Sequence, residues 1–318
     1  MKKDDLIKEL KELGFIGYSK YKKEDLIFTL ELIKESYEDD CINEILKVKS
    51  KGFNVEPMLN NKFNYSQIWE IGSGIIRELN VKLYADSKFD SHQMNQIRYG
   101  LIDNLDTSIY ADAKYNDRQM YEIRVALRKG VPKSIISKFL NPNIKANKMS
   151  FIFNLFNENI NIFNLLNEDI VNELSEKDMY SVRFLSNNEK HIKNFLSMNL
   201  DQKKEINKVI YENKLDLLSF VDNKFSFRQI REIGYGLIDN LDVSTYANVE
   251  FSSSQMEQIR VGLENLVNIS IYLDKSIDYK TMKEIRVSIE NKKFKRNEFF
   301  DFNETENKFV IKDEFKGN

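Results

Sequence analysis

Two groups of cationic residues in this sequence have the type and spacing to bind phosphate. The first is a row of arginines in which Arg98 and Arg124 stand 26 residues apart, as do Arg260 and Arg286. A guanidinium group binds phosphate oxygens through paired N–H donors. A row of such groups at a fixed interval suits the phosphate backbone of a nucleic acid. We therefore expect these four arginines to lie along one edge of the folded chain.

The same arginines have an alternative role in pairing with acids of neighbouring repeats, such as Asp86, Asp112 and Asp274, or with an acidic protein partner. Residues 61–140 contain twelve Lys or Arg and nine acids, and residues 221–300 contain twelve of each. This near balance of charge favours pairing within the protein over contact with phosphate.

The second cationic group surrounds Tyr21 and comprises Lys20, Lys22 and Lys23. Leucine and isoleucine recur at helical spacing on both sides of it, which predicts two short helices crossing over a small core. A helix N-terminus adds its own attraction for phosphate. We expect the lysines to contact phosphate, and Tyr18 and Tyr21 to stack or pack beside them.

This N-terminal pattern, Leu-x3-Leu-x2-Leu-Gly followed by Tyr-Ser-Lys-x-Lys-Lys-x-x-Leu-Ile, resembles the helix–extended loop–helix class that includes SAP domains and the N-terminal segment of Rho-like proteins. In that class the loop and the start of the second helix often contact DNA or RNA, which implies nucleic-acid contact through Lys20, Lys22 and Lys23. However, residues 1–36 contain eight basic and eight acidic side chains. A purely structural or protein-docking helical pair is therefore the alternative.

The sequence contains no residue pattern that is typical of catalysis. Cys41, His92 and His191 are too few soft ligands for a zinc cluster, and Cys41 has the position of a packed residue near a helix start. Gly72 and Gly74 lie within a helical pattern and lack the preceding strand of a nucleotide-binding loop. We expect no enzymatic activity, no cofactor and no metal.

The elements that must position these residues are helical repeats. Asp90 and Gln93 have the spacing of a helix-capping box, and Phe89 and Met94 have that of a hydrophobic staple. The third helical position recurs every 26 residues within two blocks, which indicates an array of supersecondary units on both sides of a more degenerate middle; it is occupied by Gln67, Gln93 and Gln119 in the first block and by Gln229, Gln255 and Thr281 in the second. Each unit is predicted to be a long helix, a tight turn and a short helix.

A small residue also recurs in the middle of each long helix. Mid-helix glycine costs up to about 1 kcal/mol relative to alanine, so we expect another backbone to pack closely over the missing side chain. The residues are Gly74, Gly100, Ala126, Gly236, Gly262 and Ser288.

The array has two related halves, since residues 61–72 closely match residues 223–234. Together with the scarcity of proline and glycine, this predicts an all-α fold, with a small N-terminal helical pair followed by an α-solenoid of helix-turn-helix repeats. The predicted divisions are a SAP/Rho-N-like domain (1–36), a first repeat block (37–140), divergent helical repeats (141–221), a second repeat block (222–295) and a C-terminal cap or tail (296–318).

The repeats have the form Phe-x3-Gln-Met-x-x-Ile-Arg-x-Gly-Leu, as in residues 89–101. This form resembles repeats in proteins of low-GC Gram-positive bacteria and their plasmids, conjugative elements and phages. The resemblance implies a mobile-genetic-element context and supplies no catalytic residue.

The net charge is −2, there is one cysteine, and no long apolar stretch is present. These features favour a cytoplasmic location without membrane contact. We expect a non-enzymatic DNA-binding or scaffold protein that serves replication or maintenance of a mobile element, with DNA as its partner and a protein partner on the solenoid surface. The alternative is a protein–protein interaction scaffold, for example one that binds a host protein, without nucleic-acid binding.

Overall fold

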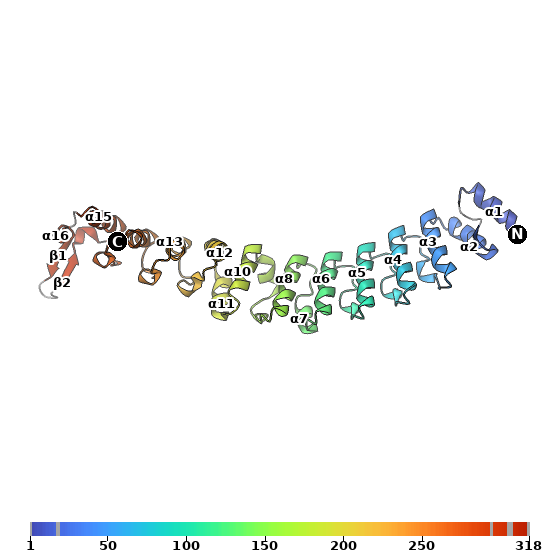
Figure 1. The fold of residues 1–318 in the computed structure, drawn as a ribbon, viewed down its shortest axis with the longest axis horizontal. Coiled ribbons are helices and arrows are strands. Elements are labelled where there is room, and N and C mark those ends of the chain that lie inside the picture. The colour runs from blue at the N-terminus through green and yellow to red at the C-terminus, as the bar shows by residue number, and fades with distance from the viewer. Residues whose placement is uncertain (1, 17–19, 293–294, 304–307, 317–318) are drawn as a thin grey trace. The chain divides into compact units, whose positions relative to one another are not determined.

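The computed structural model describes residues 2–16, 20–292, 295–303 and 308–316. The chain folds into two compact units, residues 1–159 and 160–318, and both are built mainly from helices (Figure 1). The predicted all-helical class is therefore confirmed, apart from one short two-stranded sheet near the C-terminus.

The first unit is a succession of helices in which each long helix packs against the next one. Contacts run from α1 to α2, α3, α4, α5, α6 and α8, with α7 against α6. The α-helices are α1 (Lys3–Glu12), α2 (Lys23–Lys34), α3 (Asp39–Ser50), α4 (Tyr65–Ile75), α5 (Ser91–Ile102), α6 (Asp117–Arg128), α7 (Lys133–Lys138) and α8 (Ala146–Asn157). Between them lie the short 3₁₀ helices η2 (Glu56–Met58), η3 (Val81–Leu83) and η4 (Thr107–Ile109).

The second unit repeats this arrangement, with contacts from α10 to α12, α13, α14 and α15. Its α-helices are α9 (Glu168–Glu173), α10 (Glu176–Phe184), α11 (Glu189–Ser197), α12 (Leu200–Asn213), α13 (Phe227–Ile238), α14 (Ser253–Glu264), α15 (Tyr279–Glu290) and α16 (Arg296–Phe299). The 3₁₀ helices are η5 (Leu217–Ser219), η6 (Val243–Thr245), η7 (Ile269–Ile271) and η8 (Asp313–Phe315). The short second helix predicted for each repeat is thus a single 3₁₀ turn after α3, α4, α5, α12, α13 and α14, whereas α6 and α10 are followed by the short α-helices α7 and α11.

The predicted capping boxes are present at the starts of α4, α5, α6, α13 and α14. In α5 the backbone N–H of Gln93 donates to Asp90, and the backbone N–H of Asp90 donates to Gln93 Oε1. Phe89 and Met94 are both buried, as a hydrophobic staple requires.

The same glutamine also joins each repeat to the next one. Gln93 Nε2 donates to the carbonyl oxygens of Tyr115 at 2.7 Å and Ala113 at 3.2 Å, both in the following repeat. Gln67, Gln119, Gln202, Gln229 and Gln255 donate to the following repeat in the same way. A glutamate could not do this, because its ionised carboxylate has no N–H to donate.

The mid-helix glycines are explained by a tyrosine, not by a second backbone as the sequence analysis expects. A Cβ at Gly100 would lie 2.0 Å from the hydroxyl oxygen of Tyr110, which donates to the carbonyl oxygen of Gln96 at 3.2 Å. Gly74 with Tyr84, Gly236 with Tyr246 and Gly262 with Tyr272 repeat this contact. The glycine makes room for a buried tyrosine from the 3₁₀ turn of its own repeat.

The C-terminal segment is folded against the last long helix. Strands β1 (Phe300–Asn303) and β2 (Lys308–Ile311) pair antiparallel, with Phe300 opposite Ile311. The backbone N–H of Asp278, the N-cap of α15, donates to the carbonyl oxygen of Phe315 at 3.2 Å. In the capping boxes this N–H donates to a glutamine side chain, but α15 has Thr281 at that position. A carbonyl of the C-terminal segment therefore replaces the missing glutamine oxygen.

Candidate functional site

The arginine row lies between consecutive helices, which agrees with pairing inside the protein and not with contact to phosphate. Arg98, Arg124 and Arg286 are buried, and Arg260 is half-buried. Arg98 is only 3% exposed, and its Nε lies 2.6 Å from Glu70 Oε2 on the preceding helix. Its guanidinium also lies against the rings of Trp69 and Tyr99. A guanidinium held in this way has little free surface for phosphate.

Pairing with an acid of the preceding repeat is therefore observed for Arg98, Arg124 and Arg260, but with acids other than Asp86, Asp112 and Asp274. Arg286 instead forms its ion pair with Glu290 of its own helix. Each arginine contacts a residue on the preceding long helix: Glu70 for Arg98, Gln96 for Arg124, Glu232 for Arg260 and Gln258 for Arg286. Asp86, Asp112 and Asp274 instead accept backbone N–H groups of their own turns. The expected partners were wrong because these turns use the aspartates for local capping.

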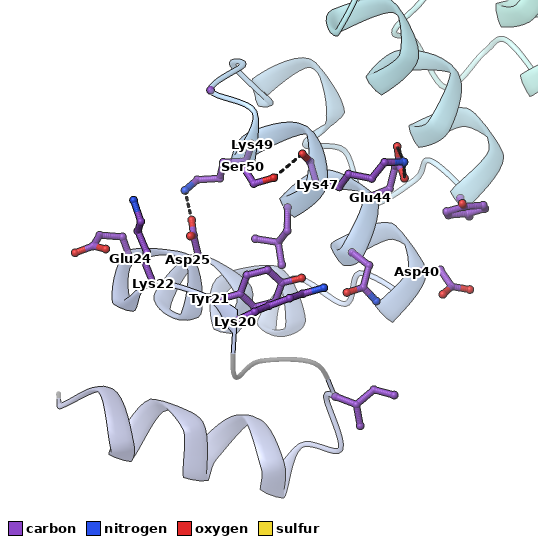
Figure 2. A pocket seen from close by; sticks show the side chains of 15 residues that line it. Lys20, Tyr21, Lys22, Glu24, Asp25, Asp40, Glu44, Lys47, Lys49 and Ser50 are labelled. Carbon is purple, nitrogen blue, oxygen red and sulfur yellow. Dashed lines mark hydrogen bonds and ion pairs between the residues drawn. The ribbon is translucent and has the colours of Figure 1, made fainter.

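The N-terminal lysines lie where the sequence places them, at the start of α2. Lys20, Lys22 and Lys23 are exposed, and Tyr21 is half-buried. Lys20 Nζ lies 5.4 Å from the centre of the Tyr21 ring, beside a groove between α2 and α3 (Figure 2). Tyr18 lies outside the described residues.

The groove between α2 and α3 carries charges of both signs. Asp25 is paired with Lys49 at 2.6 Å, and Glu44 with Lys47 at 2.8 Å. Glu24 and Asp40 also line it. Lys22 and Lys23 form no ion pair with any other residue that the structure describes. The start of α2 therefore offers a small local group of lysines within a mixed surface.

The structure has two surfaces that were not predicted from the sequence. The first, which we call the aromatic face, consists of Tyr65, Trp69, Tyr99 and Tyr121 on α4, α5 and α6. These side chains are 40% to 45% exposed. Arg98 lies against the rings of Trp69 and Tyr99, and Arg124 lies against those of Tyr99 and Tyr121. Trp69 and Tyr121 are the fifth residues of their helices, whereas Tyr99 is the ninth, so the 26-residue period does not reveal the row.

The second surface, which we call the lysine–tyrosine face, lies on α10, α12 and α13. It consists of Lys177, Tyr180, Lys208, Tyr211, Lys214 and Tyr235. The rings of Tyr180 and Tyr211 meet edge to face at 5.0 Å, and Lys214 Nζ lies 4.3 Å from the centre of the Tyr180 ring. Lys177 lies over Tyr211, and Lys208 over Tyr235. The signal in the sequence is a basic residue three or four positions from each tyrosine.

Cys41 and His191, the side chains most often used in catalysis, are poorly placed for it. Cys41 is buried in α3, and desolvation raises the pKa of its thiol, which opposes formation of the reactive thiolate. His191 is held by Asp216 at 2.8 Å. Within the described ranges, no three His, Cys, Asp or Glu side chains gather as a metal site would require.

Comparisons with protein-family models, curated proteins and solved structures find no match to this chain. Among the described residues, none of the helices combines the length and the apolar character needed to cross a membrane.

Proposed function

We propose that this chain is a non-enzymatic, single-stranded DNA-binding protein whose two units are α-solenoids. The observation that carries the proposal is the lysine–tyrosine face. Proteins that bind single strands without sequence preference combine cationic groups for the phosphates with aromatic rings for the bases. Lys177, Lys208 and Lys214 supply the first and Tyr180, Tyr211 and Tyr235 the second, on three neighbouring helices. The repeat resemblance suggests a role in replication or maintenance of a mobile element.

The charges around this face support local contact with phosphate. Lys177, Lys208 and Lys214 form no ion pair with other described residues, whereas Lys204 is paired with Asp201. Glu176 and Glu212 lie close by in the sequence, so the attraction acts at short range. We expect a correspondingly modest affinity that falls as salt concentration rises.

Lys20, Lys22 and Lys23 are proposed as a second contact. They are exposed at the start of α2 and lie beside Tyr21. Two separate contacts on one chain would raise the overall affinity for a strand long enough to reach both of them.

The test is a titration of the full chain with single-stranded and duplex DNA at several salt concentrations. The double variant Lys208→Glu/Lys214→Glu should bind single strands at least about tenfold more weakly. The control, Lys280→Glu/Lys283→Glu, makes the same change of charge at exposed positions of α15 and should bind normally. Salt-insensitive binding, or equal binding by both variants, would contradict the proposal.

A second candidate function is that of a protein-interaction scaffold, favoured by the aromatic face. Tyr, Trp and Arg are the residues enriched at protein-binding hot spots. Because Arg98 is neutralised by Glu70, this face offers apolar rings more than positive charge. Purification of partners from nuclease-treated lysate tests this function, with Trp69→Ala/Tyr99→Ala as the variant expected to lose them.

A further inference from the structure

Several long helices have a glutamate as their sixth residue. Where such a helix is followed by another long helix, the glutamate has a cationic partner, and Glu122 is the one exception among the described residues. The pairs are Glu44 with Lys47, Glu70 with Arg98, Glu205 with Arg231 and Glu232 with Arg260, at 2.8, 2.6, 2.5 and 2.9 Å. Glu122, on α6, forms no ion pair with any residue that the structure describes, and its hydrogen-bond partner is the neutral Ser150.

The cause of the exception lies in the next helix. In α5 the eighth helical residue is Arg98, which reaches back to Glu70. In α8 the eighth residue is Phe153, which is buried and has no charge. Ser150 is a neutral hydrogen-bond donor to Glu122, just as Asn95 is a neutral hydrogen-bond donor to Glu70. Burial raises the pKa of Glu122, with Ser150 and Lys129 acting in the opposite direction.

Glu122 is also accessible from outside, because it lines an open groove between α6 and α8. The groove has a volume of about 880 Å³. Tyr121 and Phe151 contribute aromatic rings to the lining of the same groove, and Gln96 and Asn147 contribute amides. Arg98 is held within the chain by the same kinds of groups, namely a carboxylate and two aromatic rings.

We propose that this groove binds the guanidinium group of an arginine side chain from a protein partner. Arginine fits better than lysine, because a planar guanidinium can pair with a carboxylate and stack on a ring at the same time. Arg118 and Lys145 also line the groove, so an acidic residue beside the arginine would complete the complementarity. A nucleic acid is disfavoured, because Glu122 and Asp117 offset the charges of Arg118 and Lys145 and would face its phosphates.

This site deepens the second candidate function, since it adds a charged contact for the partner of the aromatic face. The chain itself provides conservative variants that should fold. Glu122→Gln places a glutamine where α5 has Gln96 and α14 has Gln258. Ser150→Arg would supply an internal guanidinium next to Glu122 and thereby fill the site.

The experiment is an NMR titration of the full chain with N-acetyl-arginine amide, followed through the side-chain resonances of Tyr121 and Glu122. N-acetyl-citrulline amide, which has the same shape without the charge, is the matched control ligand. We expect saturable shifts with arginine, at least about tenfold weaker binding of citrulline, and the same loss in Glu122→Gln and Ser150→Arg. Equal binding of both ligands, no saturable shift, or unchanged binding by Glu122→Gln would overturn the site.

The experiments distinguish a wrong proposal for the arginine-binding groove from a wrong proposal for the scaffold function. Arginine binding without any protein recovered from lysate leaves the site intact and removes the scaffold. Protein partners that bind Glu122→Gln and wild-type chains equally leave the scaffold intact and remove the site.

Discussion

Gln93 donates from Nε2 to the carbonyl oxygen of Tyr115 at 2.7 Å, while its Oε1 accepts from the backbone N–H of Asp90 at 2.8 Å. One side-chain amide therefore both caps its own helix and fastens the following repeat. The two functions require a donor and an acceptor on the same group, which among the long side chains glutamine provides. This explains why the position recurs as glutamine while its neighbours vary.

The first prediction compares the same chemical change at two positions of α5. Gln93→Glu would direct carboxylate oxygens at the carbonyls of Tyr115 and Ala113 and should cost about 2 kcal/mol of the free energy of unfolding. Gln96→Glu would instead place a carboxylate beside Arg124, as Glu70 lies beside Arg98. It should leave stability unchanged within about 1 kcal/mol or increase it. Urea denaturation of both variants checks this, and equal effects would contradict it.

The second prediction concerns the glycine beneath Tyr110. Gly100→Ala would place a Cβ 2.0 Å from the tyrosine hydroxyl and 2.7 Å from Thr107 Cγ2. The resulting overpacking should cost about 2 kcal/mol, although alanine is the better helix former. Tyr110→Phe removes the atom in closest contact, so the double variant should lose less stability than the two single changes together. Additive losses in thermal or urea unfolding would argue against this contact.

The third prediction is that Arg98 is structural. Arg98→Met would leave the buried carboxylate of Glu70 without its ionic partner, which should cost about 3 kcal/mol. Glu70→Gln should be much milder, because Gln96 and Gln258 occupy the same position beside Arg124 and Arg286. DNA affinity of the folded Arg98→Met chain should equal that of wild type. A large loss of affinity with little loss of stability would restore the phosphate-binding interpretation of the arginine row.

The fourth prediction follows from the raised pKa of Glu122. A carboxyl with a higher pKa in the folded than in the unfolded chain opposes folding when it is ionised. This penalty is fully present above the folded-state pKa and disappears below the unfolded-state value. Glu122→Gln should therefore be more stable than wild type at pH 7, with the difference closing as pH falls toward 4. Denaturant titrations across this range test it, and a gap that is independent of pH would be inconsistent with it.

Local features of the fold could be predicted because they depend on residues close together in the chain. The capping box of Asp90 and Gln93 spans three positions, and the staple of Phe89 and Met94 spans five. The exposed lysines at the start of α2 were predicted for the same reason. The tyrosine contact was not predicted, although its signal is local: each of Gly74, Gly100, Gly236 and Gly262 has a tyrosine ten residues later, whereas Ala126 has Ile136.

The partners of the arginines could not be obtained in this way, because they depend on how one helix is rotated and shifted against the next. A shift of a few residues decides whether the eighth residue of a helix meets a glutamate or fills the core, as Arg98 and Phe153 show. The aromatic face could not be predicted for the same reason, because Trp69 and Tyr99 become neighbours only after α4 and α5 pack together.

By itself, the sequence determined that the chain is helical, where most of its long helices begin, and that its repeats recur every 26 residues, because these properties follow from capping and periodic apolar residues. Only the tertiary structure decided that the arginines are internal, that Glu122 forms no ion pair with a described residue, and that the aromatic and lysine–tyrosine faces exist. Helix propensity acts along the chain, whereas burial and charge pairing act between side chains that only packing brings together.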